Sequence, residues 1–285
     1  MPELPEAEVV GQQIRANLLG AQLNDCWVGR ADIVREGLST LPWYCGARLK
    51  GVERYGKSVA LGFHKGNELR YVVAELGMTG LLLFRATQTK HPQHVHVRMS
   101  FTGGRESELR YWNPRRFGRL SLFDQAGLDR YRARRFGVDP LTVPRDEFIS
   151  LMEARRGRLK PLLMHQQVIA GIGNIYANEV LFRTKLHPNR KVSRLREAAI
   201  IRLYDTMQTV LRDAISCGGS SVKDFFAPDG TEGHYKQHHL VYGKEGQLCP
   251  NRCGRIIRRL QSERSSFVCP TCQTSKSPKV LRRER

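Results

Sequence analysis

The sequence predicts an α+β protein with a β-rich N-terminal part, a helical middle part and a small C-terminal module. Short runs of strand-forming residues follow one another between about residues 46 and 123, and helical periodicity dominates after Pro144. Two closely spaced cysteine pairs lie near the C-terminal end. A chain of 285 residues can form two domains with cores of their own and a small appendage.

The first element predicted is an amphipathic helix over residues 5–19. Val10, Ile14 and Leu18 recur at four-residue spacing, which places them on one helical face, and Gly20 ends the pattern. This apolar face predicts that the helix packs against the domain that follows it.

Short strands are predicted over residues 58–63, 71–76, 81–84, 95–101 and 120–123. In the fourth run, Val95, Val97 and Met99 alternate with polar residues, which is typical of a half-buried strand. Several short strands in succession favour a β-sandwich or a barrel.

Helices are predicted over residues 146–155, 174–185 and 193–215, and the last of these ends at Gly218-Gly219. The second one follows a glycine-rich turn, Gly171-Ile172-Gly173-Asn174. Free backbone N–H groups at a helix N-terminus suit a phosphate, although an ordinary tight turn is the alternative.

The charge of the chain indicates the class of its partner. Lys and Arg number 47 against 27 Asp and Glu, which gives a formal net charge of +20 and predicts a polyanionic partner. There is no run of eighteen apolar residues and no pattern of a secretory signal at the N-terminus. We therefore expect an intracellular protein that does not enter a membrane.

The seven cysteines fall into two groups. Cys26, Cys45 and Cys217 are scattered among apolar neighbours and are assigned no role. The spacing of the other four is typical of a tetrahedral zinc site, and four thiolates leave no open position for catalysis. Two disulfides are the alternative, which a reducing compartment disfavours. The four predicted zinc ligands are Cys249, Cys253, Cys269 and Cys272.

Pro2 is a candidate nucleophile. Removal of Met1 would make its secondary amine the N-terminus, and an amine that attacks a sugar anomeric carbon gives an iminium. A neutral fraction of an α-amino group exists near pH 7 because its pKa is ordinarily about 8. The alternative is that Pro2 and Pro5 only begin a helix.

Six blocks of residues, in order, resemble the bacterial formamidopyrimidine-DNA glycosylases, within the wider group that includes endonuclease VIII. The resemblance runs from Pro2 to Gln273. The blocks are Pro2-Glu3-Leu4-Pro5-Glu6, Gly56-Lys57, Leu76-Gly77-Met78-Thr79-Gly80, Asn113-Pro114-Arg115-Arg116-Phe117-Gly118, Gly171-Ile172-Gly173-Asn174-Ile175-Tyr176-Ala177, and the cysteine module that ends in Cys272-Gln273.

The resemblance implies a β-sandwich N-terminal domain over residues 1–134 and a helix-two-turn-helix domain with a lesion-capping loop over residues 135–234. A zinc finger over residues 235–273 and a basic disordered tail over residues 274–285 would follow. Damaged double-stranded DNA would lie between the domains, and the protein would act as a monomer in the bacterial cytoplasm, associated with the nucleoid through DNA.

The implied activity is that of a bifunctional DNA glycosylase and lyase of base excision repair. Pro2 would attack the deoxyribose and Glu3 would protonate or stabilise the opening sugar. Lys57 would contact phosphate and assist elimination, and Arg264 would bind the phosphate beside the lesion together with Asn174. The iminium would then allow β-elimination and δ-elimination of the strand.

An enzyme that acts on a base inside duplex DNA must flip the nucleotide out and fill the gap. The resemblance assigns this wedge to Met78, Arg115 and Phe117, although the two apolar residues could belong to the core. Further implied contacts with DNA are His91, His94, Arg115, Arg116, Arg155 and Lys160. For any single surface cation, a solvated side chain is the alternative.

The preferred lesion is predicted less directly. Leu4 and a full-length loop over residues 218–243 resemble the branch that excises oxidised purines, chiefly 8-oxoguanine and formamidopyrimidines, and a preference for oxidised pyrimidines is the rival. A catalytically silent DNA-binding protein is the other alternative. The chain departs from the family pattern in the three residues between Cys249 and Cys253, in the spacing of the histidine pair, and at His165, where acidic residues are common.

Overall fold

The computed structural model describes residues 2–89, 91–221, 225–261 and 264–274. Met1, part of the predicted lesion-capping loop and nearly all of the predicted basic tail lie outside these residues. The described residues form two compact units: those within 2–141, 166–172 and 211–238 form the first, and those within 142–165, 173–210 and 239–274 the second. The chain therefore passes between the units more than once, whereas the domain boundaries predicted from the sequence follow the chain in order.

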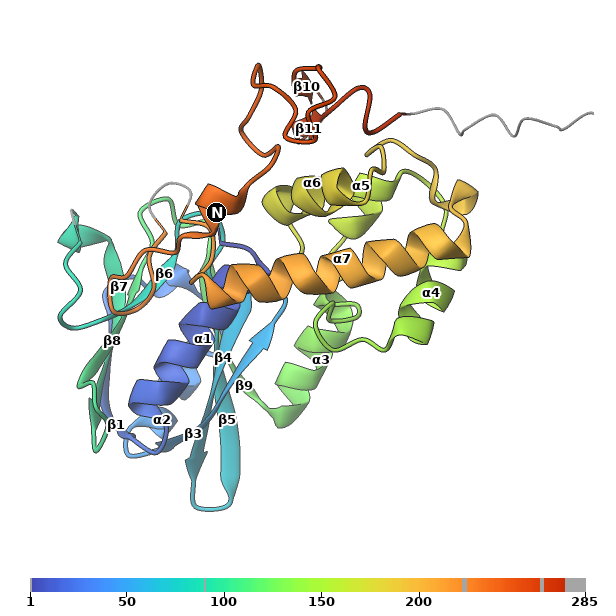
Figure 1. Cartoon of the computed structure of the whole chain (residues 1–285). Helices are drawn as coiled ribbons and strands as arrows, with labels where there is room; N and C mark the ends of the chain where they lie inside the picture. The colour runs from blue at the N-terminus through green and yellow to red at the C-terminus, as the bar shows by residue number, and fades with distance from the viewer. Residues whose placement is uncertain (1, 90, 222–224, 262–263, 275–285) are drawn as a thin grey trace, which may run out of the picture. The chain divides into compact units, whose positions relative to one another are not determined.

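The first unit is built on one sheet of nine strands (Figure 1), in the order β2-β9-β5-β4-β3-β1-β7-β8-β6. All neighbours are antiparallel except β2 and β9. The strands are β1 (Gln22–Val28), β2 (Val34–Glu36), β3 (Arg48–Tyr55), β4 (Ser58–Lys65), β5 (Glu68–Glu75), β6 (Leu81–Phe84), β7 (Val95–Thr102), β8 (Glu108–Trp112) and β9 (Arg119–Asp124).

This sheet folds into two facing layers. β1 pairs with β7 along most of its length, but it pairs with β3 only between Gln22 and Arg48. Side chains from both halves of the sheet share one core, and Leu23, Val97 and Leu122 line the same small apolar cavity within it. The predicted β-sandwich is confirmed.

Helices cover parts of this sandwich. Helix α1 (Leu4–Leu18) packs against β3 and β4 and buries Val10, Ile14 and Leu18, as predicted from their spacing. The short α2 (Leu41–Tyr44) and the helix α3 (Gln125–Arg135) were not predicted. Helix α3 is rich in arginine and buries only Gly127, Leu128 and Tyr131, so its apolar periodicity is weak.

The five predicted strands are confirmed as β4, β5, β6, β7 and β9, with ends shifted by at most three residues. Strands β1, β3 and β8 were not predicted. Polar residues interrupt the alternation in β1 and β3, whereas β8 alternates but has only five residues. Strand β2 has three residues, too few to show a period.

The second unit contains α4 (Arg145–Glu153), α5 (Leu159–Leu163), α6 (Asn174–Arg183), most of α7 (Glu197–Ser216), and the hairpin of β10 (Arg258–Leu260) and β11 (Ser266–Val268). The three predicted helices are confirmed as α4, α6 and α7. Helix α7 begins later than predicted, since residues 192–194 form a separate 3₁₀ turn. No helix among the described residues is both long and apolar enough to cross a membrane.

A buried carboxylate joins α6 to the start of the cysteine module. Glu179 is fully buried, and its oxygens accept the backbone N–H groups of Leu240, Val241 and Tyr242 at 2.9–3.0 Å. Arg183 lies 3.7 Å from the same carboxylate. Hydrogen bonds to an ionised acceptor are about twice as strong as neutral ones, so Glu179 fixes the backbone at this point.

We expect the substitution Glu179→Gln to loosen this junction, because an amide has one acceptor oxygen and no charge. Loss of charge-assisted hydrogen bonds costs about 2 kcal/mol. Amide hydrogen exchange at residues 240–242 should therefore become about 30-fold faster. The exposed Glu153→Gln in α4 is the control, and equal exchange in both variants would contradict the role given to Glu179.

Candidate active site and metal centre

The first turn of the chain is buried. Pro2 and Glu3 are both buried, and Glu3 is the N-cap of α1. Pro5 stands in the first helical turn, where a proline favours helix initiation, whereas Pro2 lies outside the helix. Pro5 therefore has the helix-starting role that was considered for both prolines, whereas Pro2 precedes the N-cap of the helix.

Glu6 fixes this turn from inside the protein. Its side chain is buried, and one carboxylate oxygen accepts the Glu3 N–H at 2.8 Å while the other accepts the Ser220 N–H at 2.7 Å. Gly219 has φ +85°, and a Cβ there would lie 2.9 Å from Glu6 Oε1. The segment after α7 is thereby held against the N-terminal turn. No role for Glu6 was predicted from the sequence, although its position three residues after the N-cap is typical of a capping box.

The predicted glycine-rich turn packs against the same residues. The Gly171 carbonyl accepts the Leu4 N–H at 3.0 Å, and a Cβ on Gly171, whose φ is +93°, would lie 2.7 Å from Leu4 Cβ. Gln166 holds the turn from behind, since it accepts the Gly171 N–H and donates to the Ile172 carbonyl. Gly171 thus allows the close approach that positions the N-terminal turn.

Lys57 belongs to the two-residue turn between β3 and β4. Its neighbour Gly56 has φ +57°, and a Cβ there would lie 2.9 Å from the Phe136 ring and 3.4 Å from the Gly171 nitrogen. The hairpin therefore reaches the same glycine that contacts Leu4. The structure therefore brings together the segment that carries Pro2 and Glu3, the hairpin that carries Lys57, and the turn at Gly171.

Arg54 connects this hairpin to α1 and to Asp139. It is largely buried, it donates to the Gly56 carbonyl at 3.2 Å, and it pairs with Glu8 of α1 at 2.8 Å and with Asp139 at 2.6 Å. Two carboxylates and one carbonyl occupy most of its fixed donors. The position of the Lys57 turn is therefore tied to α1.

The three predicted wedge residues lie on two adjacent loops of the sandwich. Met78 is 39% exposed and Phe117 is 57% exposed, so neither belongs to the core. The Arg115 guanidinium lies 5.1 Å from the centre of the Phe117 ring. Gly77 has φ +61°, and a Cβ there would lie 2.5 Å from the Gly118 nitrogen, so the two loops are in direct contact.

Near these loops, Arg116 has φ +53° and its guanidinium lies 3.8 Å from Asp32. The predicted pair His91 and His94 forms a short turn before β7, with ring centres 5.8 Å apart. Both rings are at least partly accessible. These residues lie on the surface of the first unit, as a contact with phosphate requires.

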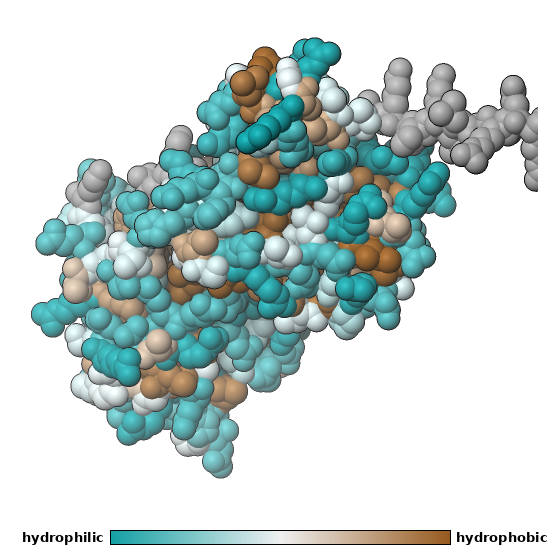
Figure 2. Space-filling view, in the orientation of Figure 1, coloured by the Kyte–Doolittle hydropathy of each residue, from teal (hydrophilic) through white to brown (hydrophobic). Residues whose placement is uncertain are grey.

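The remaining predicted DNA contacts lie in the second unit. Asn174 is the first residue of α6 and accepts from Asn178. Arg155 and Arg264 are exposed. A cavity of about 750 Å³ lies between α5 and the finger, and Arg158, Lys160, His165 and Arg264 are among its lining residues. Figure 2 shows that hydrophilic side chains cover most of the face in view.

Lys160 has a different environment from the one predicted. Its side chain is 4% exposed, and the ammonium donates to the Ser265 carbonyl and Ser266 Oγ, both at 2.8 Å, and to the Arg264 carbonyl at 3.3 Å. An ammonium has three donors. A contact with phosphate would need one of these hydrogen bonds to break, and Lys160 holds the backbone around Arg264 instead.

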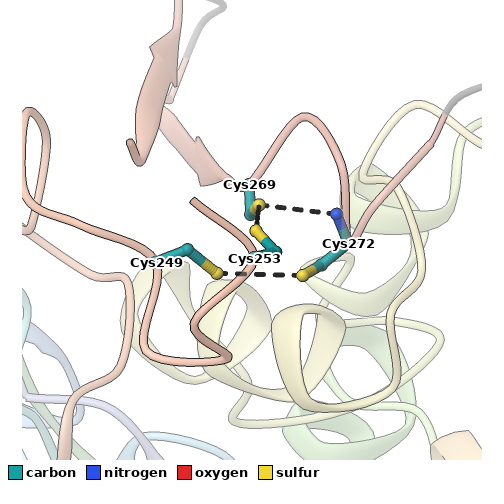
Figure 3. A group of neighbouring side chains, drawn as sticks. All are labelled: Cys249, Cys253, Cys269 and Cys272. Atoms are coloured by element: carbon teal, nitrogen blue, oxygen red, sulfur yellow. Dashed lines mark hydrogen bonds between the residues drawn. The ribbon is translucent and has the colours of Figure 1, made fainter. Parts of the chain in front are cut away.

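The four predicted zinc ligands gather at one point (Figure 3). Their sulfur atoms all lie within 4.8 Å of one another, and the Cys249–Cys272 and Cys253–Cys269 pairs are 3.7 and 3.4 Å apart. Both separations exceed the 2.05 Å of a disulfide bond, so the disulfide alternative fails. The cluster can hold a metal ion.

The extra residue between Cys249 and Cys253 is accommodated locally. Arg252 adopts φ +54°, and its N–H donates to the Cys249 carbonyl at 2.9 Å. This left-handed residue tightens the turn enough for both sulfur atoms to reach the cluster. The departure from the family spacing changes the turn but keeps the four thiols together.

The family model for the N-terminal domain of formamidopyrimidine-DNA glycosylase matches residues 1–120, and the one for the helix-two-turn-helix domain matches residues 136–226. The chain belongs to the formamidopyrimidine-DNA glycosylase family. It is therefore an enzyme of DNA repair with a β-sandwich domain, a helix-two-turn-helix domain and a four-cysteine finger, as the sequence blocks predicted.

Curated relatives extend over the whole length. The formamidopyrimidine-DNA glycosylase of Pelotomaculum thermopropionicum is 34% identical over 97% of this chain and all of its own, and that of Pseudomonas aeruginosa is 35% identical over 96% of this chain and all of its own. The recognition of the family from the six blocks is confirmed.

Solved structures of this family are similar in fold to the chain. The Thermus thermophilus protein has a TM-score of 0.83 and 33% identity, and covers 97% of this chain and all of its own. A Lactococcus lactis enzyme variant in complex with DNA that contains Fapy-dG has a TM-score of 0.85 and 29% identity, and covers 96% of this chain and all of its own.

We expect Gly171→Ala to lower base excision by at least about tenfold, because the new Cβ would displace Leu4 and with it the buried first turn. A left-handed φ alone costs an alanine on the order of 1 kcal/mol. Gly66→Ala is the matched control, since Gly66 also has a positive φ, of +61°, but a Cβ added there would meet no atom within 4 Å. Single-turnover excision rates should separate the two variants, and equal rates would count against this role for Gly171.

Removal of one thiolate should empty the metal centre. We expect Cys272→Ser to lose bound metal and to lose hydrogen-exchange protection over residues 245–273, because a structural site supplies most of the stability of so small a fold. Cys217→Ser, which lies outside the cluster, should keep both. Elemental analysis of the purified protein gives the metal content, and an unchanged content in Cys272→Ser would contradict the assignment.

Proposed function

We propose that this enzyme excises oxidised purines, chiefly 8-oxoguanine and formamidopyrimidines, from duplex DNA and then cleaves the strand. The observation that carries the proposal is the meeting of the segments of Pro2, Glu3 and Lys57 at Gly171. Solved relatives in complex with DNA that contains Fapy-dG or carbocyclic 8-oxo-G support the choice of substrate.

In this mechanism the Pro2 nitrogen, exposed once Met1 is removed, attacks the anomeric carbon of the flipped nucleotide. The bond from that carbon to the base breaks, and the base leaves with the bonding electrons and takes up the proton that the nitrogen loses. Glu3 donates a proton to the ring oxygen as the sugar opens, and the nitrogen loses its own proton to give an iminium. Glu6 and Gly171 support the step by fixing the turn that carries both groups.

Strand cleavage follows from the iminium, which withdraws electrons from the neighbouring carbon. Loss of a C2′ proton sends its electron pair into a new double bond, and the 3′ phosphate leaves. A second elimination releases the 5′ phosphate. Lys57, on the hairpin beside Gly171, would bind phosphate and assist these proton transfers, with Arg264 and Asn174 bound to the phosphate next to the lesion.

The wedge would be Met78, Arg115 and Phe117. Their exposure and the contact between their loops support this role, because an apolar chain and an aromatic ring can replace the stacking of the flipped base. The guanidinium of Arg115 could hydrogen-bond the orphaned base. His91, His94, Arg116 and Arg155 would contact the phosphate backbone, and Lys160 would act by shaping the backbone that presents Arg264.

The metal would be one structural zinc ion per chain, bound by four thiolates with no position open for water. The basic chain would work as a monomer on bacterial DNA in the cytoplasm. A net charge of +20 supports strong, salt-dependent association with a polyanion.

Leu4 and the loop after α7 support a preference for purines. The part of the loop described after residue 224 is docked on the sandwich, because Phe225 lies in its core and the Pro228 carbonyl accepts from Phe84 N–H and Thr87 Oγ1. Excision of oxidised guanine should exceed that of thymine glycol in a matched duplex. The reverse order would favour the pyrimidine-directed alternative.

Borohydride trapping tests the nucleophile. Untagged protein should form a covalent adduct with duplex DNA that contains 8-oxoguanine. Pro2→Gly, which replaces the secondary amine with a primary one, or an N-terminally tagged form should trap far less. Pro5→Ala is the matched control from the same turn and should still trap. Wild-type protein that gives no adduct with any oxidised or abasic duplex would support a catalytically silent DNA-binding protein instead.

A further inference from the structure

The loop that carries Arg115 and Phe117 is fixed by a buried histidine that no site described so far includes. His96 lies on β7 and is 4% exposed, and its Nε2 lies 3.0 Å from the Asn113 carbonyl oxygen. A carbonyl oxygen can only accept, so Nε2 is assigned the proton and donates.

The surroundings keep this ring neutral. Burial is the main cause that lowers the pKa of His96, and the hydrogen bond to Asn113 opposes this effect. Electrostatic interactions with His94, Arg30 and Arg116 lower the pKa of His96 further. Near neutral pH, His96 is therefore a neutral donor with one tautomer fixed by its partner.

Asn113, the partner of His96, closes the loop over residues 113–118. Its side chain is fully buried, and its amide donates to Tyr111 Oη at 3.0 Å and to the Gly118 carbonyl at 3.2 Å. Its amide oxygen accepts the Arg116 N–H at 3.0 Å. Asn113 thus determines the conformation of the segment that displays the guanidinium and the aromatic ring.

The same residue joins this loop to the histidine turn. The Asn113 N–H donates to the His94 carbonyl at 2.9 Å, and the indole of Trp112 donates to the His91 carbonyl at 2.9 Å. The backbone of Asn113 is therefore held at both its N–H and its C=O by residues 94 and 96. An apolar residue in place of His96 would leave a buried carbonyl without this donor.

We propose that His96 is a positioning residue for the strand wedge: its hydrogen bond to Asn113 holds Arg115 and Phe117 in the geometry that enters duplex DNA. The proposal rests on the proposed function. Because a wedge fills a gap in a base stack, it is needed for a lesion in duplex DNA. It is not needed for the reaction of Pro2 with an abasic sugar in a single strand. If His96 acts only through the wedge, its substitution should slow excision from duplex DNA but leave the reaction with a single-stranded abasic site unchanged.

The test compares substitutions that keep or remove the donor. The terminal nitrogen of Gln reaches about as far as Nε2, so His96→Gln can still donate to Asn113, whereas His96→Met fills similar space without a donor. His96→Asn is polar but one methylene too short, and it replaces His96→Met if that variant does not fold. His64→Met, an exposed histidine of β4, is the control.

We expect His96→Met to excise 8-oxoguanine from duplex DNA at least about tenfold more slowly than wild type in single turnover, with His96→Gln within about threefold of wild type. Borohydride trapping of His96→Met on a single-stranded abasic oligonucleotide should remain within about twofold. A 2-aminopurine placed opposite the lesion should report weaker wedge insertion in His96→Met alone.

Equal losses on duplex and single-stranded DNA would show a general structural role and overturn the proposal, as would wild-type excision in His96→Met or failure of His96→Gln to restore it. Failure of the proposed function gives a different result, since wild-type protein would then trap on neither substrate. In that case wedge insertion could still be compared between the variants by the 2-aminopurine signal. A signal in His96→Met equal to that of wild type would refute the role of His96.

Discussion

Buried hydrogen bonds fix the first turn of this chain, and the chemistry proposed for the enzyme depends on them. Chain termini are usually mobile unless other elements hold them. Here the Gly171 carbonyl accepts the Leu4 N–H, and the carboxylate of Glu6 accepts two further N–H groups, one of them from Ser220. A nucleophile at the very start of a chain can meet a sugar in a defined geometry only if the residues behind it are held in this way.

Glycines make this construction possible because three separate segments approach one another more closely than a side chain would allow. Gly56, Gly171 and Gly219 all have a positive φ, and each would place a Cβ within 3 Å of a neighbouring atom. These glycines come from a hairpin, a turn before α6 and the segment after α7. Because these glycines lack a Cβ, Gly171 leaves room for the Leu4 side chain, Gly219 for the Glu6 side chain and Gly56 for the Phe136 ring.

In the second unit, buried charged side chains fix the backbone of other segments. Glu179 binds three consecutive N–H groups, and Lys160 binds acceptors on residues 264–266, so the finger is attached to α5 and α6 through buried charges. Asn113 and His96 fix the exposed loop of Arg115 in the same manner with neutral groups. In each case a buried polar side chain fixes the backbone of a segment from another part of the chain.

The sequence by itself determined the elements with a strong local period, such as α1, α7 and β7, the four-thiol cluster, and the family, because these depend on spacing within short segments. It also supplied Pro2, Glu3 and Lys57 as candidates. Only the tertiary structure decided the roles of Glu6 and His96 and the inward direction of Lys160, since their partners lie far away in the sequence and no local pattern records them. The arginine-rich α3 was not predicted for a related reason: its burial depends on the sheet against which it packs, and its own apolar periodicity is weak.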